Sequence, residues 1–208
     1  MPMAPKPVLR TAPLRVVGVP APMPRRPKNA DVRVREHLTP SEVEALAAAA
    51  KKRGRYGHRD AFAIRFAARH GFRVSELCAL RWDQIDLDAG LMHVHRLKNG
   101  EPSTHTLRGD EIRALRQLRR DWPEGRFVFV TERGAPFSRA GFAKMVERAG
   151  EAAGFAFPVH FHMLRHACGY KFANDGQDTR SLQLWLGHKA IQHTVKYTQL
   201  SAKRFKDW

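Results

Sequence analysis

The chain has 208 residues, of which 43% are apolar, enough for one hydrophobic core of ordinary size. Lys and Arg total 37 against 20 Asp and Glu, and the resulting net charge of +17 indicates a polyanionic partner, nucleic acid before acidic protein or lipid. There is no apolar run of membrane-spanning or signal-peptide length and no CxxC pair, so we expect no membrane partner, no disulfide framework and a cytoplasmic protein.

Residues 1–36 are predicted to form a basic, Pro-rich, disordered arm. They hold eight of the 13 prolines and a net charge of +6. Proline fixes φ and lacks a backbone donor, so this stretch cannot build a helix or a sheet. Three interpretations stay open: a solvated tail, a start assigned too far upstream, and a tether that binds DNA without regard to sequence.

Residues 37–208 are predicted to form one domain, α+β and mainly helical, with a small antiparallel β-sheet. Its first helix begins where Thr39 can act as cap, Pro40 suits the first helical position, and Glu42 closes a capping box. A second helix covers about Arg59–His70 and stops at Gly71, and a short helix follows over Val74–Leu80.

The next elements are two extended runs, Leu91–Leu97 and Ser103–Leu107, joined through Asn99-Gly100. Asn-Gly is a strong hairpin signal because both turn positions need a positive φ. The remaining predicted elements are a helix over about Asp110–Asp121, a strand at Phe127–Val130, helices over Ser138–Ala153, His162–Asn174 and Asp178–Leu186, and a last short turn that contains Tyr197.

Two arginines have the placement that binding of a phosphate would need. Arg73 follows a glycine turn at the mouth of a helix, with Glu76 one turn on to hold it; the alternative is an ordinary surface pair. His162 and Arg165 lie three residues apart on one helical face. Zinc is the rival interpretation of His160, His162 and His166, but HExxH spacing and an acidic cluster are both missing. His160 is instead predicted to be a helix-entry residue and His166 a packed or supporting histidine.

Three further residues complete a possible site. His188 follows Gly187 in the turn after a predicted helix, and Tyr197 comes nine residues later. Lys98 stands immediately before the Asn99-Gly100 turn. Taken singly, Tyr197 could be a core tyrosine and Lys98 a charged residue that decorates a turn.

Taken in order, these residues resemble the tyrosine recombinase (phage integrase) family, whose pattern is Arg, Lys, His-x-x-Arg, His or Trp, Tyr. The similarity spans about residues 38–200. It includes the local text RVSELCALRW, HMLRH, LGH and HTVKYT. The segments HGFRVSEL, IDLDAG, HRLKNG and HMLRHACG look like the small fimbrial phase-variation recombinases, which invert a promoter segment.

The resemblance implies the chemistry. Tyr197 would attack the scissile phosphate and form a 3′-phosphotyrosyl link, and a 5′-hydroxyl of the partner duplex would reverse the step, so neither a metal nor another cofactor is needed. The implied catalytic residues are Arg73, Lys98, His162, Arg165, His188 and Tyr197, with Glu76 behind them. Lys98 would protonate the leaving oxygen.

The resemblance also implies the partners: double-stranded DNA, a homo-tetramer on two DNA sites, and room for an accessory DNA-bending protein. Inversion, excision and integration all stay open as outcomes. A non-catalytic DNA-binding transcriptional regulator is the alternative from another class, and topoisomerase-like relaxation would use the same chemistry without strand exchange.

Overall fold

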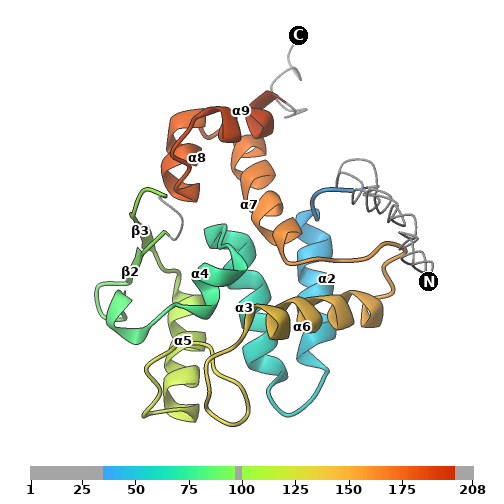
Figure 1. The fold of residues 1–208 in the computed structure, drawn as a ribbon, viewed down its shortest axis with the longest axis vertical. Helices are drawn as coiled ribbons and strands as arrows, with labels where there is room; N and C mark the ends of the chain where they lie inside the picture. Colours follow the sequence, from blue (N-terminus) through green and yellow to red (C-terminus); the bar gives the residue numbers. More distant parts are fainter. Residues whose placement is uncertain (1–34, 97–99, 200–208) are drawn as a thin grey trace, which may run out of the picture. The chain divides into compact units, whose positions relative to one another are not determined.

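The computed structural model describes residues 35–96 and 100–199. Nearly all of the predicted N-terminal arm, together with Lys98 and Asn99, lies outside these described residues. The predicted fold class is confirmed: helices dominate, and a small antiparallel sheet accompanies them (Figure 1). The elements are α2 (Pro40–Lys51), α3 (Gly57–His70), α4 (Val74–Cys78), η1 (Trp82–Gln84), β1 (Ile85–Asp86), β2 (Leu91–Val94), β3 (Ser103–Thr106), α5 (Gly109–Asp121), α6 (Arg139–Ala152), α7 (His162–Asn174), α8 (Thr179–Leu186) and α9 (Gln192–Gln199).

Local capping signals fix most helix ends. Thr39 caps α2, and the Glu42 carboxylate accepts a hydrogen bond from the Thr39 backbone N–H at 2.7 Å, which completes the predicted capping box. Helices α3 and α8 each end on a left-handed glycine, Gly71 at φ +62° and Gly187 at φ +65°. These two glycine turns matter below because Arg165 donates a hydrogen bond to a backbone carbonyl in each of them.

Two sequence-based predictions of secondary structure were wrong. Residues 127–130 form no strand; they make only isolated bridges, Arg81 to Phe127 and Val130 to Pro136, while Val128 and Phe129 are buried in the core. The predicted short turn around Tyr197 is an eight-residue helix, α9. The sheet also gains a third strand, β1, that the pattern did not indicate.

The main core lies between α2, α3, α6 and α7, which pack on one another around a set of phenylalanines. In Figure 1, α7 runs from this layer to α8 and α9, with which it also packs. A second, smaller apolar cluster fills that junction and includes Cys168, Leu182, Leu186 and Tyr197. Tyr197 is thus placed by the packing of three helices.

The sheet is antiparallel with the order β1-β2-β3, and Val94 at the end of β2 pairs with Ser103 at the start of β3. Two side-chain contacts hold the strands in place next to the loop that connects β2 to β3. The Gln84 amide donates to the His93 carbonyl at 2.9 Å, and His93 Nδ1 lies 3.1 Å from the Thr104 hydroxyl. The chain segment that follows β2 therefore leaves a well-anchored strand.

Candidate active site

Arg73 and Glu76 form the pair that the sequence predicts. After the Gly71 turn, Phe72 is buried in the core and Arg73 becomes the N-cap of α4. The Glu76 carboxylate accepts from the Arg73 backbone N–H at 2.9 Å and from its Nη1 at 2.7 Å. Glu76 is buried, whereas 28% of the Arg73 side chain is exposed. Glu76 thus fixes the arginine and leaves part of the guanidinium accessible.

Arg165 joins the two glycine turns. Its guanidinium, 2% exposed, donates from Nη1 to the carbonyl of Gly71 and from Nη2 to the carbonyl of Leu186 at 2.9 Å. Burial, and then the nearby Arg73 and Arg96, lower the pKa of Arg165 to about 10, so it stays charged at neutral pH. One buried cation therefore connects the ends of α3 and α8 to α7.

His162 and His188 bring two imidazoles to the same place. His162 is exposed one turn before Arg165, and His188 is buried in the turn after Gly187, where its Nδ1 lies 2.8 Å from the Thr194 hydroxyl. Desolvation and the neighbouring cations lower the pKa of His162 to about 4 and that of His188 to about 3. Both rings are consequently neutral at pH 7.

The Tyr197 ring is 1% exposed and packs on the bare backbone of Gly169 in α7. Its hydroxyl lies 2.9 Å from His166 Nδ1. Burial raises the pKa of the phenol well above its ordinary value, with Arg165 opposing the shift. The hydroxyl is therefore protonated at neutral pH, and it becomes a nucleophile only where a base or added cationic charge assists it.

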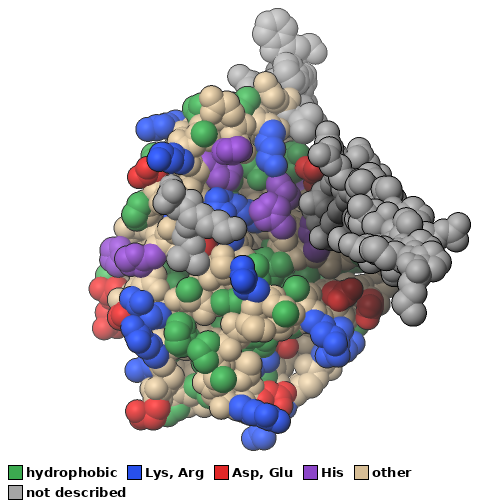
Figure 2. All heavy atoms as spheres, in the orientation of Figure 1, with side chains coloured by type: hydrophobic (Ala, Val, Ile, Leu, Met, Phe, Trp, Pro, Cys, Tyr) green, Lys and Arg blue, Asp and Glu red, His purple; other side chains and the backbone are tan. Residues whose placement is uncertain are grey.

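One pocket of about 560 Å³ collects most of the predicted set. Figure 2 shows histidine and Lys or Arg side chains together on the face that α7, α8 and the hairpin share. The predicted residues that line the pocket are Arg73, His162, Arg165, His188 and Tyr197, and Glu76 lies behind them. The remaining predicted residue, Lys98, lies outside the described residues; Gly100, just past it, lines the pocket.

Sequence reasoning gave too little weight to two pocket residues. His166 was predicted to be a packed or supporting histidine, yet it contacts the Tyr197 hydroxyl. Lys196 lies 3.5 Å from His166 Nδ1 and 5.0 Å from the centroid of the Tyr197 ring, and burial lowers its pKa. The signal for His166 was present, because it lies four residues after His162 and so shares a helical face with it.

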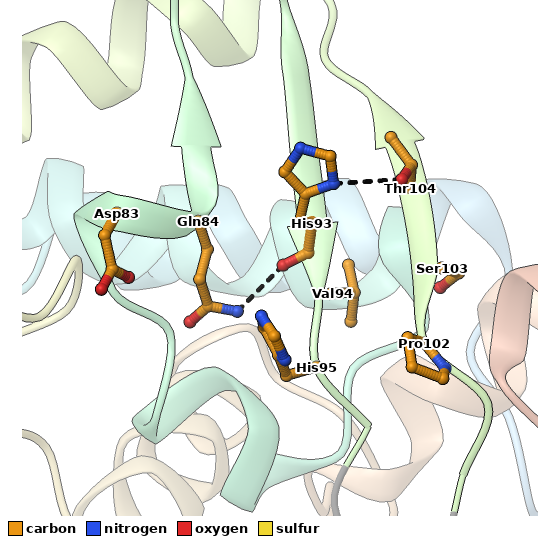
Figure 3. Close-up of a pocket in the computed structure, with 8 residues that line it drawn as sticks. All are labelled: Asp83, Gln84, His93, Val94, His95, Pro102, Ser103 and Thr104. Atoms are coloured by element: carbon orange, nitrogen blue, oxygen red, sulfur yellow. Dashed lines mark hydrogen bonds between the residues drawn. The ribbon is translucent and has the colours of Figure 1, made fainter.

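A separate pocket of about 370 Å³ lies on the sheet, lined by residues of η1, β2 and β3 (Figure 3). Polar groups of Gln84, His93 and Thr104 in this pocket already make the contacts that hold the strands in place. Within the described ranges, no group of three or more His, Cys, Asp or Glu side chains is arranged to hold a metal ion. No helix among those residues is long and apolar enough to cross a membrane.

The chain is similar to known proteins of one family. Residues 36–204 match the model of the phage integrase family. The chain is 42% identical over 181 residues to the type 1 fimbriae regulatory protein FimB of Escherichia coli K12, covering 85% of this chain and 90% of that protein. It is 32% identical over 181 residues to the tyrosine recombinase XerD of Ralstonia nicotianae, covering 84% of this chain and 59% of that protein.

The crystal structure of XerA recombinase superimposes with a TM-score of 0.70 at 26% identity, over 80% of this chain and 61% of that one. The family match extends over most of the chain, and FimB is matched over nearly its whole length. The chain therefore belongs to the phage integrase family and is a site-specific recombinase of the tyrosine type.

Proposed function

We propose that this pocket cleaves and rejoins DNA through a covalent 3′-phosphotyrosyl intermediate on Tyr197. The observation that carries the proposal is the shared pocket, in which two arginines and two neutral histidines surround one buried tyrosine. Attack by the phenol oxygen forms the O–P bond as the bond to the 5′-oxygen breaks, and the phenol proton must leave. The phosphodiester energy is kept in the new link, so the reverse attack by a 5′-hydroxyl restores DNA.

The charges of the site suit each partner in that step. Arg73 and Arg165 are positioned to bind the non-bridging oxygens, where negative charge builds in the transition state. Guanidinium forks match phosphate geometry better than ammonium groups do. A neutral His188 donates a hydrogen bond to the phosphate, and a neutral His162 assists proton transfer. Lys98 protonates the leaving 5′-oxygen.

His166 has a supporting part in this scheme. A neutral His166 with an unprotonated Nδ1 accepts the hydrogen bond of the Tyr197 hydroxyl at 2.9 Å. Neutrality is favoured because desolvation, Lys196 and His162 lower the pKa of His166 to about 3. The ring thus orients the phenol and offers its proton a first acceptor as the phosphate approaches.

The partner is double-stranded DNA, and strand exchange needs two duplexes held together. We propose a homo-tetramer on two DNA sites, with residues 1–36 as a basic tether and with use of an accessory DNA-bending protein. The resemblance of its motifs to the small fimbrial phase-variation recombinases favours inversion of a DNA segment over integration. Action on chromosomal DNA would place the protein at the nucleoid.

The test is a covalent adduct that survives denaturation. Adducts mapped on host DNA identify the target site, and a nicked duplex of that site then traps the intermediate, because the short strand diffuses away. The adduct should form in EDTA without nucleotide. Tyr197→Phe removes only the hydroxyl, so it should abolish the adduct and leave DNA affinity nearly unchanged. Adduct formation by the Phe variant would reject Tyr197, and DNA binding with no adduct from the wild type would favour the non-catalytic regulator.

A further inference from the structure

Behind the pocket lies a buried arginine outside the predicted catalytic set. Arg96 lies in the loop that connects β2 to β3, and its side chain has no exposed surface. Its Nη1 donates to Glu76 Oε2 at 2.9 Å, and its Nη2 donates to the carbonyl of Trp185 near the end of α8. One side chain thus connects the β2–β3 loop, α4 and α8.

Two glycines beside Arg96 leave space for its side chain. A Cβ at Gly187 would lie 2.6 Å from Arg96 Cγ, and a Cβ at Gly100 would lie 2.7 Å from Arg96 Cβ. Both approaches are too close for any side chain, so glycine at these two positions makes room for Arg96. The guanidinium also lies 5.8 Å from the centroid of the Phe72 ring.

A chain of buried hydrogen bonds continues behind Arg96. His105 Nε2 lies 3.5 Å from Arg96 Nη2 and 2.9 Å from the Ser103 hydroxyl, and both of those groups can donate to it. His105 Nδ1 faces His70 Nδ1 at 2.9 Å, and His70 Nε2 faces Glu111 at 3.1 Å. With His70 donating to Glu111, His105 must donate to His70, so its Nε2 is an acceptor for Arg96. Burial lowers the pKa of both imidazoles, so both are neutral at pH 7 and leave the Arg96 charge to Glu76.

Three arginines surround the single carboxylate of Glu76. Arg73 and Arg96 donate to it directly, whereas Arg165 Nη1 stays 3.9 Å from Oε2. Arg96 occupies the oxygen that lies nearest Arg165. Without Arg96, the buried Glu76 carboxylate would keep only the partly exposed Arg73 as a direct partner, and its incompletely compensated charge would attract Arg165.

We propose that Arg96 is a positioning residue that saturates Glu76 and so keeps Arg73 and Arg165 available for the scissile phosphate. Arg96 itself touches neither the DNA nor the reacting atoms. This inference rests on the proposed function, since the phosphate is what the two arginines are kept free to bind. It assigns a task to a buried ion pair whose desolvation cost offsets much of its contribution to stability.

The test compares Arg96→Met with Arg59→Met. Arg59 is a matched control because it is also buried, pairs with the carboxylate of Asp60, and donates to the Val130 carbonyl at 2.8 Å, all outside the pocket. Single-turnover cleavage of the nicked duplex by folded Arg96→Met should fall about 10²-fold, the effect of roughly 1 Å of misplacement. DNA affinity should stay unchanged, and Arg59→Met should cleave at nearly the wild-type rate.

A double variant separates positioning from general damage to the fold. In Glu76→Gln there is no charge to saturate, so adding Arg96→Met should slow cleavage no further. If the fold-loss of cleavage in the double variant equals the product of the losses in the two single variants, the proposal is overturned. Near-normal cleavage by Arg96→Met would also overturn it.

A crystal structure of Arg96→Met tests the idea independently of cleavage. Arg165 should close from 3.9 Å to hydrogen-bond distance of Glu76. An unmoved Arg165 would overturn the proposal even if the wild type cleaves DNA. If Arg165 closes on Glu76 in the variant but the wild type forms no adduct, the failure lies with the proposed function.

Discussion

Gly169→Ala should move the Tyr197 nucleophile while it removes none of the polar groups of the pocket. A Cβ at residue 169 would lie 2.7 Å from both Cε1 and Cζ of Tyr197. Ordinary carbon contacts need about 3.5–4.0 Å, so the ring must retreat by about 1 Å. That shift also breaks the 2.9 Å contact between the Tyr197 hydroxyl and His166.

The expected loss follows from this displacement. A misplacement of about 1 Å costs a reaction about 10²-fold, so single-turnover adduct formation on the nicked duplex should fall by about that factor. Stability should change less, because replacing a helical glycine by alanine gains about 1 kcal/mol and overpacking costs about 1–3 kcal/mol. A thermal melt of the variant should therefore still show a folded protein.

Gly150→Ala is the matched control. It is also a helical glycine, and its added Cβ would lie 2.6 Å from Val159 Cγ2, far from the proposed chemistry in sequence and outside the pocket lining. It should lose stability without losing the cleavage rate of the folded fraction. If Gly169→Ala is folded and cleaves as fast as the wild type, or faster, the position of Tyr197 described here is not the one from which it attacks.

Three other predictions concern the arginines, the histidines and the C-terminal segment. Arg73→Lys and Arg165→Lys should each lower cleavage by about 10²-fold or more, since lysine keeps the charge but loses the fork, and a near-normal rate would remove that arginine from the site. Burial depresses the folded-state pKa of His105 to about 2 and of His166 and His188 to about 3, so the unfolded chain takes up protons first as pH falls below about 6.5. Between pH 7 and pH 5, proton uptake at each of these histidines in the unfolded chain should lower the free energy of unfolding by up to about 2 kcal/mol. Denaturant titrations that show equal stability at both pH values would contradict this. The C-terminal segment places Phe205 and Trp208 among charged residues, and we expect these aromatic side chains to insert into a neighbouring subunit. Deleting residues 201–208, which lie outside the described residues, should therefore spare folding and DNA affinity but sharply reduce synapsis. Full-rate recombination or an unfolded product would refute the insertion.

Local signals were enough to predict most helices. The Thr39 cap with Glu42, and the glycines at 71 and 187, act within one turn of the chain, so their effect can be predicted without knowing the tertiary fold. The strand prediction for residues 127–130 was wrong because an apolar run forms a strand only beside a partner strand. Here the run makes only isolated bridges, and its side chains fill the core. Around Tyr197 a strong start or stop signal was missing, and α9 owes its helix to packing on α7 and α8.

The residues of the site likewise include some that local motifs indicate and one, Arg96, that they do not. Its chemical groups stood in sequence motifs, so Arg73, Arg165, His188 and Tyr197 could be expected together, and the pocket brings them together. Arg96 could not be expected, because its partners lie 20 residues before it at Glu76 and 89 residues after it at Trp185. Nothing local distinguishes such a buried cation from the many exposed arginines of a basic chain.

The most direct measurement is the identity of the residue that becomes attached to DNA. The trapped adduct would be digested with nuclease and trypsin and sequenced by mass spectrometry. Cleavage after Lys196 and Lys203 gives a peptide that begins with Tyr197 and ends at residue 203. We predict a nucleotide joined through its 3′-phosphate to Tyr197 in this peptide. Attachment to Tyr170, Tyr56 or a serine, or a link through a 5′-phosphate, would contradict the proposed mechanism.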